Sequence, residues 1–77
     1  MIYERIRNLR EDSDTTQQTM ADWLYINRRT YSSYETGVRQ IPLDMLAKLA
    51  DIYDTSVDYL MGRTDVKKPY PKSKRRF

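Results

Sequence analysis

The chain has 77 residues with a formal net charge of +3, and it contains neither cysteine nor histidine. This length suits one small domain and is too short for a substrate cleft beside a catalytic domain, while the missing residue types exclude disulfides, the commonest general base and the usual zinc sites. For these reasons we expect a protein that is not an enzyme and needs neither cofactor nor metal. No apolar run is long enough for a secretory signal or a membrane span, so we also expect the protein to be soluble and cytoplasmic.

Hydrophobic residues recur at helical spacing through five short segments, and no stretch alternates as a strand would, so the sequence predicts an all-α fold of five helices. In the first segment Ile2, Ile6 and Leu9 stand at i, i+4 and i+7 and form one apolar stripe. The stripe ends near Asp12, because the short polar side chains of 12–15 favour caps and turns. The first helix is therefore predicted to end at about Asp12.

The second predicted helix follows this polar cluster directly. Thr16 or Thr15 caps it, and Thr15 would form a capping box with Gln18 three residues on. Its buried face consists of Met20, Ala21 and Leu24. The small alanine in this face allows another helix to approach closely.

The third predicted helix covers 28–36 and has signals at both ends. Asn27 is a favoured cap residue, and Gly37 is the residue that most easily takes the left-handed conformation after a helix. Tyr31 and Tyr34, three residues apart, form its buried side. A short turn therefore joins the second helix to the third.

The fourth and fifth predicted helices complete the body of the domain. Pro42 suits the first turn of the fourth helix, where a missing N–H is tolerated. The apolar face of this helix consists of Leu46, Leu49, Ala50 and Tyr53. Thr55, with Asp58 three residues on, begins a last short helix. This helix carries Val57 and Leu60 and is closed by Gly62.

Charge divides the chain into a body, 1–65, and a basic tail, 66–77. The body holds eight bases against eleven acids, about −3, whereas the tail holds six bases and no acid, about +6. The prolines and lysines of the tail predict a disordered segment. These bases either lie along DNA phosphates and add salt-sensitive affinity, which we favour, or only keep the end of the chain soluble.

Two helices joined by a tight turn, the second opening with two arginines, match the helix-turn-helix that docks in the DNA major groove. Arg28 and Arg29 each present a planar fork that fits O6 and N7 of guanine. Ser32 and Ser33, one turn later, are small enough to allow close approach. An isolated arginine pair is more commonly a solvated face or an ion-pair partner. Here the cap before the pair and the glycine after the helix favour the DNA-binding interpretation.

Four segments and one further arginine match the pattern of a known family. They are IRNLRED, TQQTMADWL, YETG, LAKLADIYDTSVDYLMG and Arg39, and Gln17, Ala21 and Leu24 stand at the family's signature positions. On these residues, 2–62 resemble the bacterial and phage Cro/CI-type helix-turn-helix proteins, the Xre family. The resemblance implies a compact lambda-repressor-like domain with the helix-turn-helix at its second and third helices.

The resemblance also implies roles for individual residues. Those expected to face bases are Arg28, Arg29 and Ser33. Those expected to contact phosphates are Thr16, Gln17, Asn27, Ser32, Thr36 and Arg39. Arg10 and Glu35 match a semi-buried ion pair between the first helix and the recognition helix, so their expected role is structural. Thr30 matches a partly buried position and is expected to pack.

The chain departs from the family pattern at three positions. Tyr25 replaces the usual glycine of the turn and is an unfavourable occupant if this position has positive φ. Thr15 replaces an apolar residue, which thins the core beneath the second helix. Trp23 stands at a usually polar position, where it either packs on the first helix or contacts a partner.

By the resemblance, the protein is expected to regulate transcription, as a repressor rather than an activator, and to lie at the nucleoid when bound to double-stranded DNA. One domain covers one half-site, so a symmetric homodimer should bind a near-palindromic operator. The expected dimer surface includes Val57, Tyr59 and Met61. The alternative is a protein-interaction module such as an antitoxin, which an exposed aromatic set of Trp23, Tyr25 and Tyr59 would favour.

Overall fold

The computed structural model describes residues 3–71, and within this range the chain forms five α-helices and no strand. The helices are α1 Glu4–Asp12, α2 Gln17–Trp23, α3 Arg28–Thr36, α4 Leu43–Ile52 and α5 Val57–Leu60. The predicted all-α, five-helix fold is confirmed. Ile2 of the predicted apolar stripe lies outside the described residues, as do Lys72, Lys74, Arg75, Arg76 and Phe77 of the tail. None of the helices between residues 3 and 71 could cross a bilayer.

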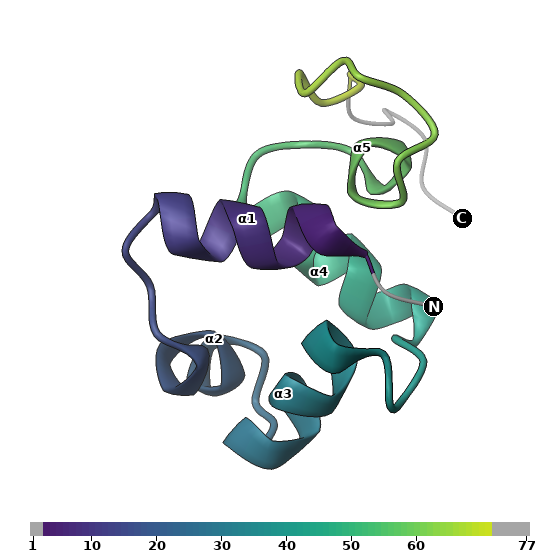
Figure 1. Cartoon of the computed structure of the whole chain (residues 1–77). Helices are drawn as coiled ribbons and strands as arrows, with labels where there is room; N and C mark the ends of the chain where they lie inside the picture. The colour runs from purple at the N-terminus through teal and green to yellow at the C-terminus, as the bar shows by residue number, and fades with distance from the viewer. Residues whose placement is uncertain (1–2, 72–77) are drawn as a thin grey trace, which may run out of the picture.

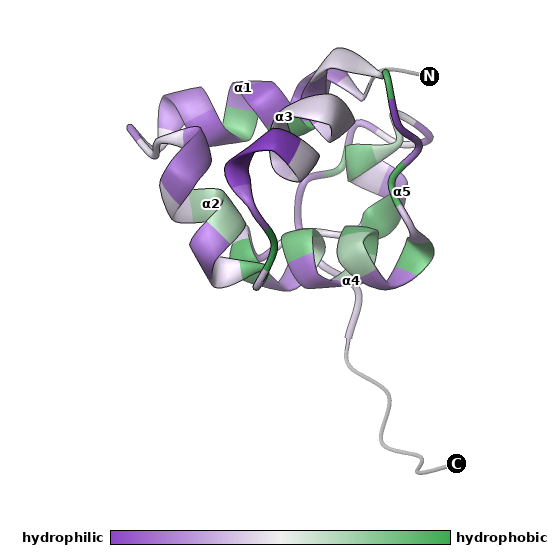
Figure 2. Cartoon of the chain, turned by 90° about the horizontal axis from the view of Figure 1, so that it is seen from below, coloured by the Kyte–Doolittle hydropathy of each residue, from purple (hydrophilic) through white to green (hydrophobic). Residues whose placement is uncertain are grey.

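One hydrophobic core holds the five helices together. It contains Ile6, Leu9, Met20, Ala21, Leu24, Tyr31, Tyr34, Ile41, Leu46, Leu49, Ala50 and Leu60. In Figure 1, α2 and α3 lie together at the bottom, α5 lies at the top, and α1 and α4 lie between them. Figure 2 shows that α4 is rich in hydrophobic residues, as its central place requires. On α3, the exposed residues Arg28, Arg29 and Thr36 are left for solvent or a ligand.

Side-chain caps fix the starts of α2 and α3. The Thr16 hydroxyl accepts a hydrogen bond from the Thr19 backbone N–H at 3.1 Å, so Thr16 rather than Thr15 is the cap of α2. The Asn27 side-chain oxygen accepts one from the Thr30 N–H at 2.7 Å, which confirms the predicted cap of α3. Each cap satisfies a backbone donor that the helix itself cannot pair.

The prediction that Thr55 starts the last helix is wrong by one residue. Ser56 caps α5, because its hydroxyl accepts from the Tyr59 N–H at 3.0 Å. Thr55 is buried and donates its hydroxyl to the Lys67 carbonyl oxygen at 2.6 Å. Its side chain is therefore committed to a segment that follows the helix rather than to the helix start.

The ends of α3 and α4 also follow local signals. Gly37 has φ of 80° after α3, in agreement with the sequence prediction. Pro42 is the residue before α4 rather than part of its first turn. Tyr53, predicted on the apolar face of α4, lies just past the helix end and is half-buried, and its hydroxyl is 3.3 Å from the Met20 sulfur.

The segment after α5 packs back on the body through Arg5 of α1. The Arg5 guanidinium donates to the carbonyl oxygens of Tyr59 and Thr64 and to the Asp65 carboxylate, and it lies 4.1 Å from the Tyr59 ring centroid. Farther along, the Tyr70 hydroxyl donates to an Asp58 carboxylate oxygen at 2.9 Å. The first residues of the predicted tail thus contact α5, and the domain boundary at residue 65 stays a prediction.

Candidate nucleic-acid interface

The turn between α2 and α3 is fixed by backbone hydrogen bonds and contains a strained residue. The Tyr25 N–H donates to the Asp22 carbonyl oxygen, and the Ile26 N–H donates to that of Ala21. Tyr25 has φ of 58°, in the left-handed region that favours glycine, yet its side chain is 91% exposed. No packing compensates the strain at the position where the family pattern has glycine.

Helix α3 presents two different faces. Tyr31, Tyr34 and Glu35 are buried on one side. At 100° per residue, Arg29 falls on the opposite side, whereas Arg28 lies about 60° from Tyr31 and about 20° from Glu35 around the helix. Both arginines are exposed at the amino end of α3. Neither guanidinium has a hydrogen-bond or ion-pair partner among residues 3–71. The two arginines at the amino end of α3 are therefore free to bind a ligand.

The remaining predicted contacts on α3 are partly committed within the helix. Ser33 is half-buried, and its hydroxyl donates to the Thr30 carbonyl oxygen at 2.6 Å. The Thr36 hydroxyl donates to the Ser33 carbonyl oxygen at 3.3 Å. Ser32 is half-buried, and Arg39 is exposed just beyond the helix. At 100° per residue, Ser32, Ser33 and Thr36 lie on the same side of α3 as Arg29. Thr30 is half-buried.

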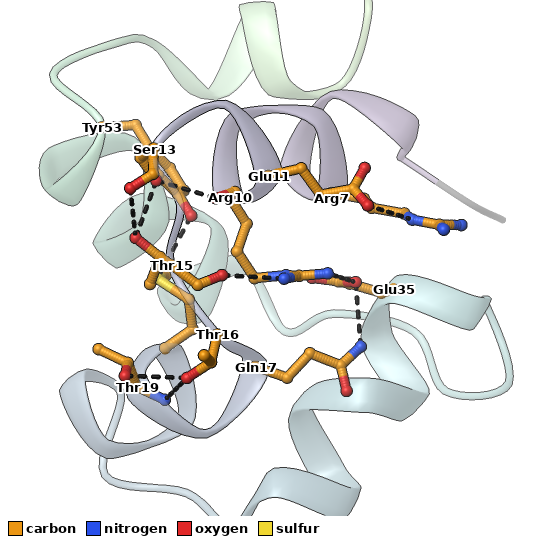
Figure 3. A network of polar contacts seen from close by, with 11 residues as sticks. Arg7, Arg10, Glu11, Ser13, Thr15, Thr16, Gln17, Thr19, Glu35 and Tyr53 are labelled. Atoms are coloured by element: carbon orange, nitrogen blue, oxygen red, sulfur yellow. Dashed lines mark hydrogen bonds and ion pairs between the residues drawn. The ribbon is translucent and has the colours of Figure 1, made fainter.

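An ion pair joins the far end of α3 to α1 (Figure 3). Arg10 donates through Nε to Glu35 Oε2 at 2.7 Å and through a terminal nitrogen to Glu35 Oε1 at 3.1 Å. Its other terminal nitrogen donates to the Thr15 carbonyl oxygen at 2.9 Å. The two side chains are 13% and 3% exposed. The bidentate pair therefore ties three elements together in a site that largely excludes water.

Gln17 at the start of α2 belongs to the same network. Its amide donates to Glu35 Oε1 at 3.2 Å, as Figure 3 shows. Burial alone would raise the pKa of Glu35, but the hydrogen bonds from Arg10 and Gln17, with the nearby Tyr31 hydroxyl, outweigh it and leave the pKa below its ordinary value. The carboxylate is thus stably ionised and orients Gln17 beside the exposed cap residue Thr16.

The Tyr31 hydroxyl is buried next to this network and has no partner at hydrogen-bond geometry among the described residues. Burial and the negative charge of Glu35 raise its pKa far above the ordinary value. Its effect on Glu35 is therefore mainly that of a nearby dipole rather than of a formed hydrogen bond. Tyr31 anchors α3 by its ring.

The aromatic residues and the predicted dimer surface differ in how much they are covered. Trp23 is 51% exposed, so it keeps a large free surface at the end of α2. Tyr59 is half-buried beneath Arg5, while Val57 and Met61 pack against the core. The sequence patterns did not predict the contacts of Arg5, because its partners lie more than fifty residues away along the chain. Residues 3–71 contain no group of acidic side chains arranged to hold a metal ion.

Comparison with known proteins agrees with this geometry. A helix-turn-helix family model (HTH_3) matches residues 6–60. The chain is 40% identical over 76 residues to the uncharacterized HTH-type transcriptional regulator YobD of Bacillus subtilis, covering 99% of this chain and 66% of YobD. It is 40% identical over 73 residues to the HTH-type transcriptional regulator AnsR of the same organism, covering 95% of this chain and 63% of AnsR.

A phage protein is similar over a shorter stretch. The cryptic phage CTXphi transcriptional repressor RstR of Vibrio cholerae is 39% identical over 62 residues, which cover 80% of this chain and 55% of RstR. The chain thus spans between about half and two thirds of the length of these relatives. No solved structure matches it significantly. With residues 6–60 matched from α1 through α5, the chain belongs to the helix-turn-helix family HTH_3.

Proposed function

We propose that this protein binds double-stranded DNA in a sequence-specific manner and regulates transcription, as a repressor rather than an activator. The observation that carries the proposal is the pair of exposed, unpartnered guanidinium groups at the amino end of α3. In a helix-turn-helix this end of the second helix enters the major groove. The transcriptional regulators and phage repressor that share the family support the same function.

The exposed residues around α3 would divide between bases and phosphates. Arg28 and Arg29 would face bases, with Ser33 beside them one turn later. Phosphates would meet Thr16, Gln17, Asn27, Ser32, Thr36 and Arg39. The amino end of α2 suits this role because its N–H groups and positive dipole end favour an anion. Arg10 neutralises Glu35 close by, so the Glu35 carboxylate does not oppose a phosphate there.

The proposed mode of binding is a symmetric dimer in the cytoplasm, bound to a near-palindromic operator. One α3 reads one half-site, and two copies would place two such helices about one turn of DNA apart. Val57, Tyr59 and Met61 are the proposed dimer surface. The basic tail would add affinity that falls with salt. Its described part lies with α5, at the opposite end of the domain from α3 in Figure 1.

Selection of bound duplexes from a random pool near physiological salt tests the proposal. The intact protein should enrich a two-fold-symmetric motif, and the variant Arg28→Ala/Arg29→Ala should lose it. Lys48→Ala/Arg63→Ala is the control, because it removes two exposed cations that lie outside α3. Failure of the intact protein to enrich any motif would refute the proposal.

A second candidate function is a protein-interaction module, with DNA binding secondary. The exposure of Trp23 and Tyr25 favours it, because aromatic residues are common anchors of protein interfaces. Tyr59 does not join this exposed set, since Arg5 covers its ring. An intact protein that enriches no motif while remaining folded would favour this candidate over the regulator.

A further inference from the structure

We infer that each operator half-site contains two guanines, one read by Arg28 and the other by Arg29, and that Ser33 donates no hydrogen bond to a base. The inference rests on the proposed function and names the DNA sequence class that it requires. It follows from which donors on α3 are free, how they are spaced, and which base edges they fit.

The donors of the predicted base-facing set differ in availability. Arg28 and Arg29 are exposed and have no partner among the described residues. Ser33 has already donated its hydroxyl proton to the Thr30 carbonyl oxygen at 2.6 Å and is half-buried. Ser33 can therefore allow close approach to the groove floor, but it offers no free proton to a base. Two side chains remain as free donors for direct readout, and guanine is the base that offers two acceptors.

The fixed position of α3 keeps these two side chains apart. They are the first two helical residues, directly after the Asn27 cap. Successive residues of a helix point about 100° apart, and their Cα atoms are about 3.8 Å from each other. Base pairs rise by about 3.4 Å, so two such side chains reach neighbouring base pairs rather than one shared pair. Each arginine should thus specify its own position.

The guanidinium fork selects guanine because it can only donate hydrogen bonds. Guanine presents two acceptors side by side in the major groove, N7 and O6. Adenine presents the N7 acceptor beside an amino donor. Thymine presents one acceptor next to a methyl group, and cytosine presents a donor. No carboxylate within the described residues binds either fork, so both can adopt the bidentate geometry without first breaking an ion pair.

Four single variants in the selection experiment test the inference: Arg28→Gln, Arg29→Gln, Arg28→Lys and Ser33→Ala. Glutamine forms its bidentate pair with adenine, so each glutamine variant should exchange guanine for adenine at one position, and the two positions should differ. Affinity for the original operator should fall by about 5- to 150-fold in each. The lysine variant keeps the charge but loses the fork, so it should relax the preference for guanine.

The salt dependence of binding separates base contacts from phosphate contacts. Loss of a base contact should leave the slope of log affinity against log salt unchanged, whereas loss of a phosphate contact lowers it by about one and weakens all sequences alike. Ser33→Ala should keep both guanines of the motif. A motif without two guanines per half-site, a uniform loss in both glutamine variants, or the loss of either guanine in Ser33→Ala would overturn the inference while the regulator function stands. Absence of any motif with the intact protein would instead refute the proposed function.

Discussion

Replacing Arg10 by leucine should remove a large part of the stability of this domain. Arg10 makes two hydrogen bonds to Glu35, at 2.7 and 3.1 Å, and one to the Thr15 carbonyl. Leucine would leave the carboxylate, 3% exposed, with Gln17 as its one remaining donor. Removing one partner of a buried pair costs about 3–5 kcal/mol. A chain of this length has a total free energy of unfolding of about 4–12 kcal/mol, so the loss should be severe.

The assay is urea unfolding followed by circular dichroism, at pH 7 and at pH 4. In the intact protein the pKa of Glu35 is lowered on folding, so its contribution to stability is present above the unfolded value of 4.5 and is lost as the pH falls below it. Without Arg10, burial dominates and raises that pKa, so protonation relieves the isolated charge. The difference between variant and intact protein should therefore be larger at pH 7 than at pH 4.

Arg7→Leu is the matched control on the same helix. Arg7 lies 3.6 Å from Glu11 in an exposed pair at i, i+4, and such pairs contribute no more than about 0.5 kcal/mol. The double variant Arg10→Leu/Glu35→Leu should regain most of the lost stability, because no charge is then left unpaired. A cost below about 1 kcal/mol for Arg10→Leu, or a cost equal at both pH values, would refute the reasoning.

Three further predictions use the same unfolding assay. Tyr25→Gly should raise stability by about 0.5–1 kcal/mol, because the relief of the positive φ exceeds the entropy that glycine adds to the unfolded chain; a loss would show that the exposed ring packs. Arg5→Ala should lower the free energy of unfolding by about 1–3 kcal/mol and raise amide exchange in α5, since charged hydrogen bonds to Tyr59 and Thr64 disappear. Burial raises the pKa of Tyr53 to about 12, so stability should fall as pH rises above 10, and less so in Tyr53→Phe.

Local signals predicted the helices well because each signal acts within a few residues. The Asn27 cap, the Gly37 end and the burial of Tyr31 and Tyr34 depend on neighbours in the same helix. The start of α5 was misplaced because Thr55 and Ser56 are both suitable caps. Thr55 instead donates its hydroxyl to the carbonyl oxygen of Lys67, twelve residues farther along the chain. No pattern within one helix contains that information.

The candidate site divides in the same way. The cap before Arg28 and Arg29 and the glycine after the helix predicted that the two arginines face a ligand, and both are exposed. The commitment of the Ser33 hydroxyl to Thr30 depends on a rotamer, which sequence spacing does not specify. The role of Arg5 at the opposite end of the domain depends on contacts with residues 59–65, which only the folded chain brings near. Patterns in the sequence do not predict long-range contacts of this kind.

The buried and the exposed residues of α3 should separate stability from recognition. Tyr31 and Glu35 hold the helix in the body through burial and the Arg10 pair, whereas Arg28 and Arg29 are exposed and have no hydrogen-bond or ion-pair partner among residues 3–71. Surface substitutions of this kind usually change stability by less than about 0.5 kcal/mol. The midpoint temperatures of unfolding of Arg28→Gln and Arg29→Gln should therefore lie within about 2–4 °C of that of the intact protein, while their operator preference changes. A glutamine variant that unfolds much earlier would mean that these arginines support the fold, and its altered binding would then say nothing about bases.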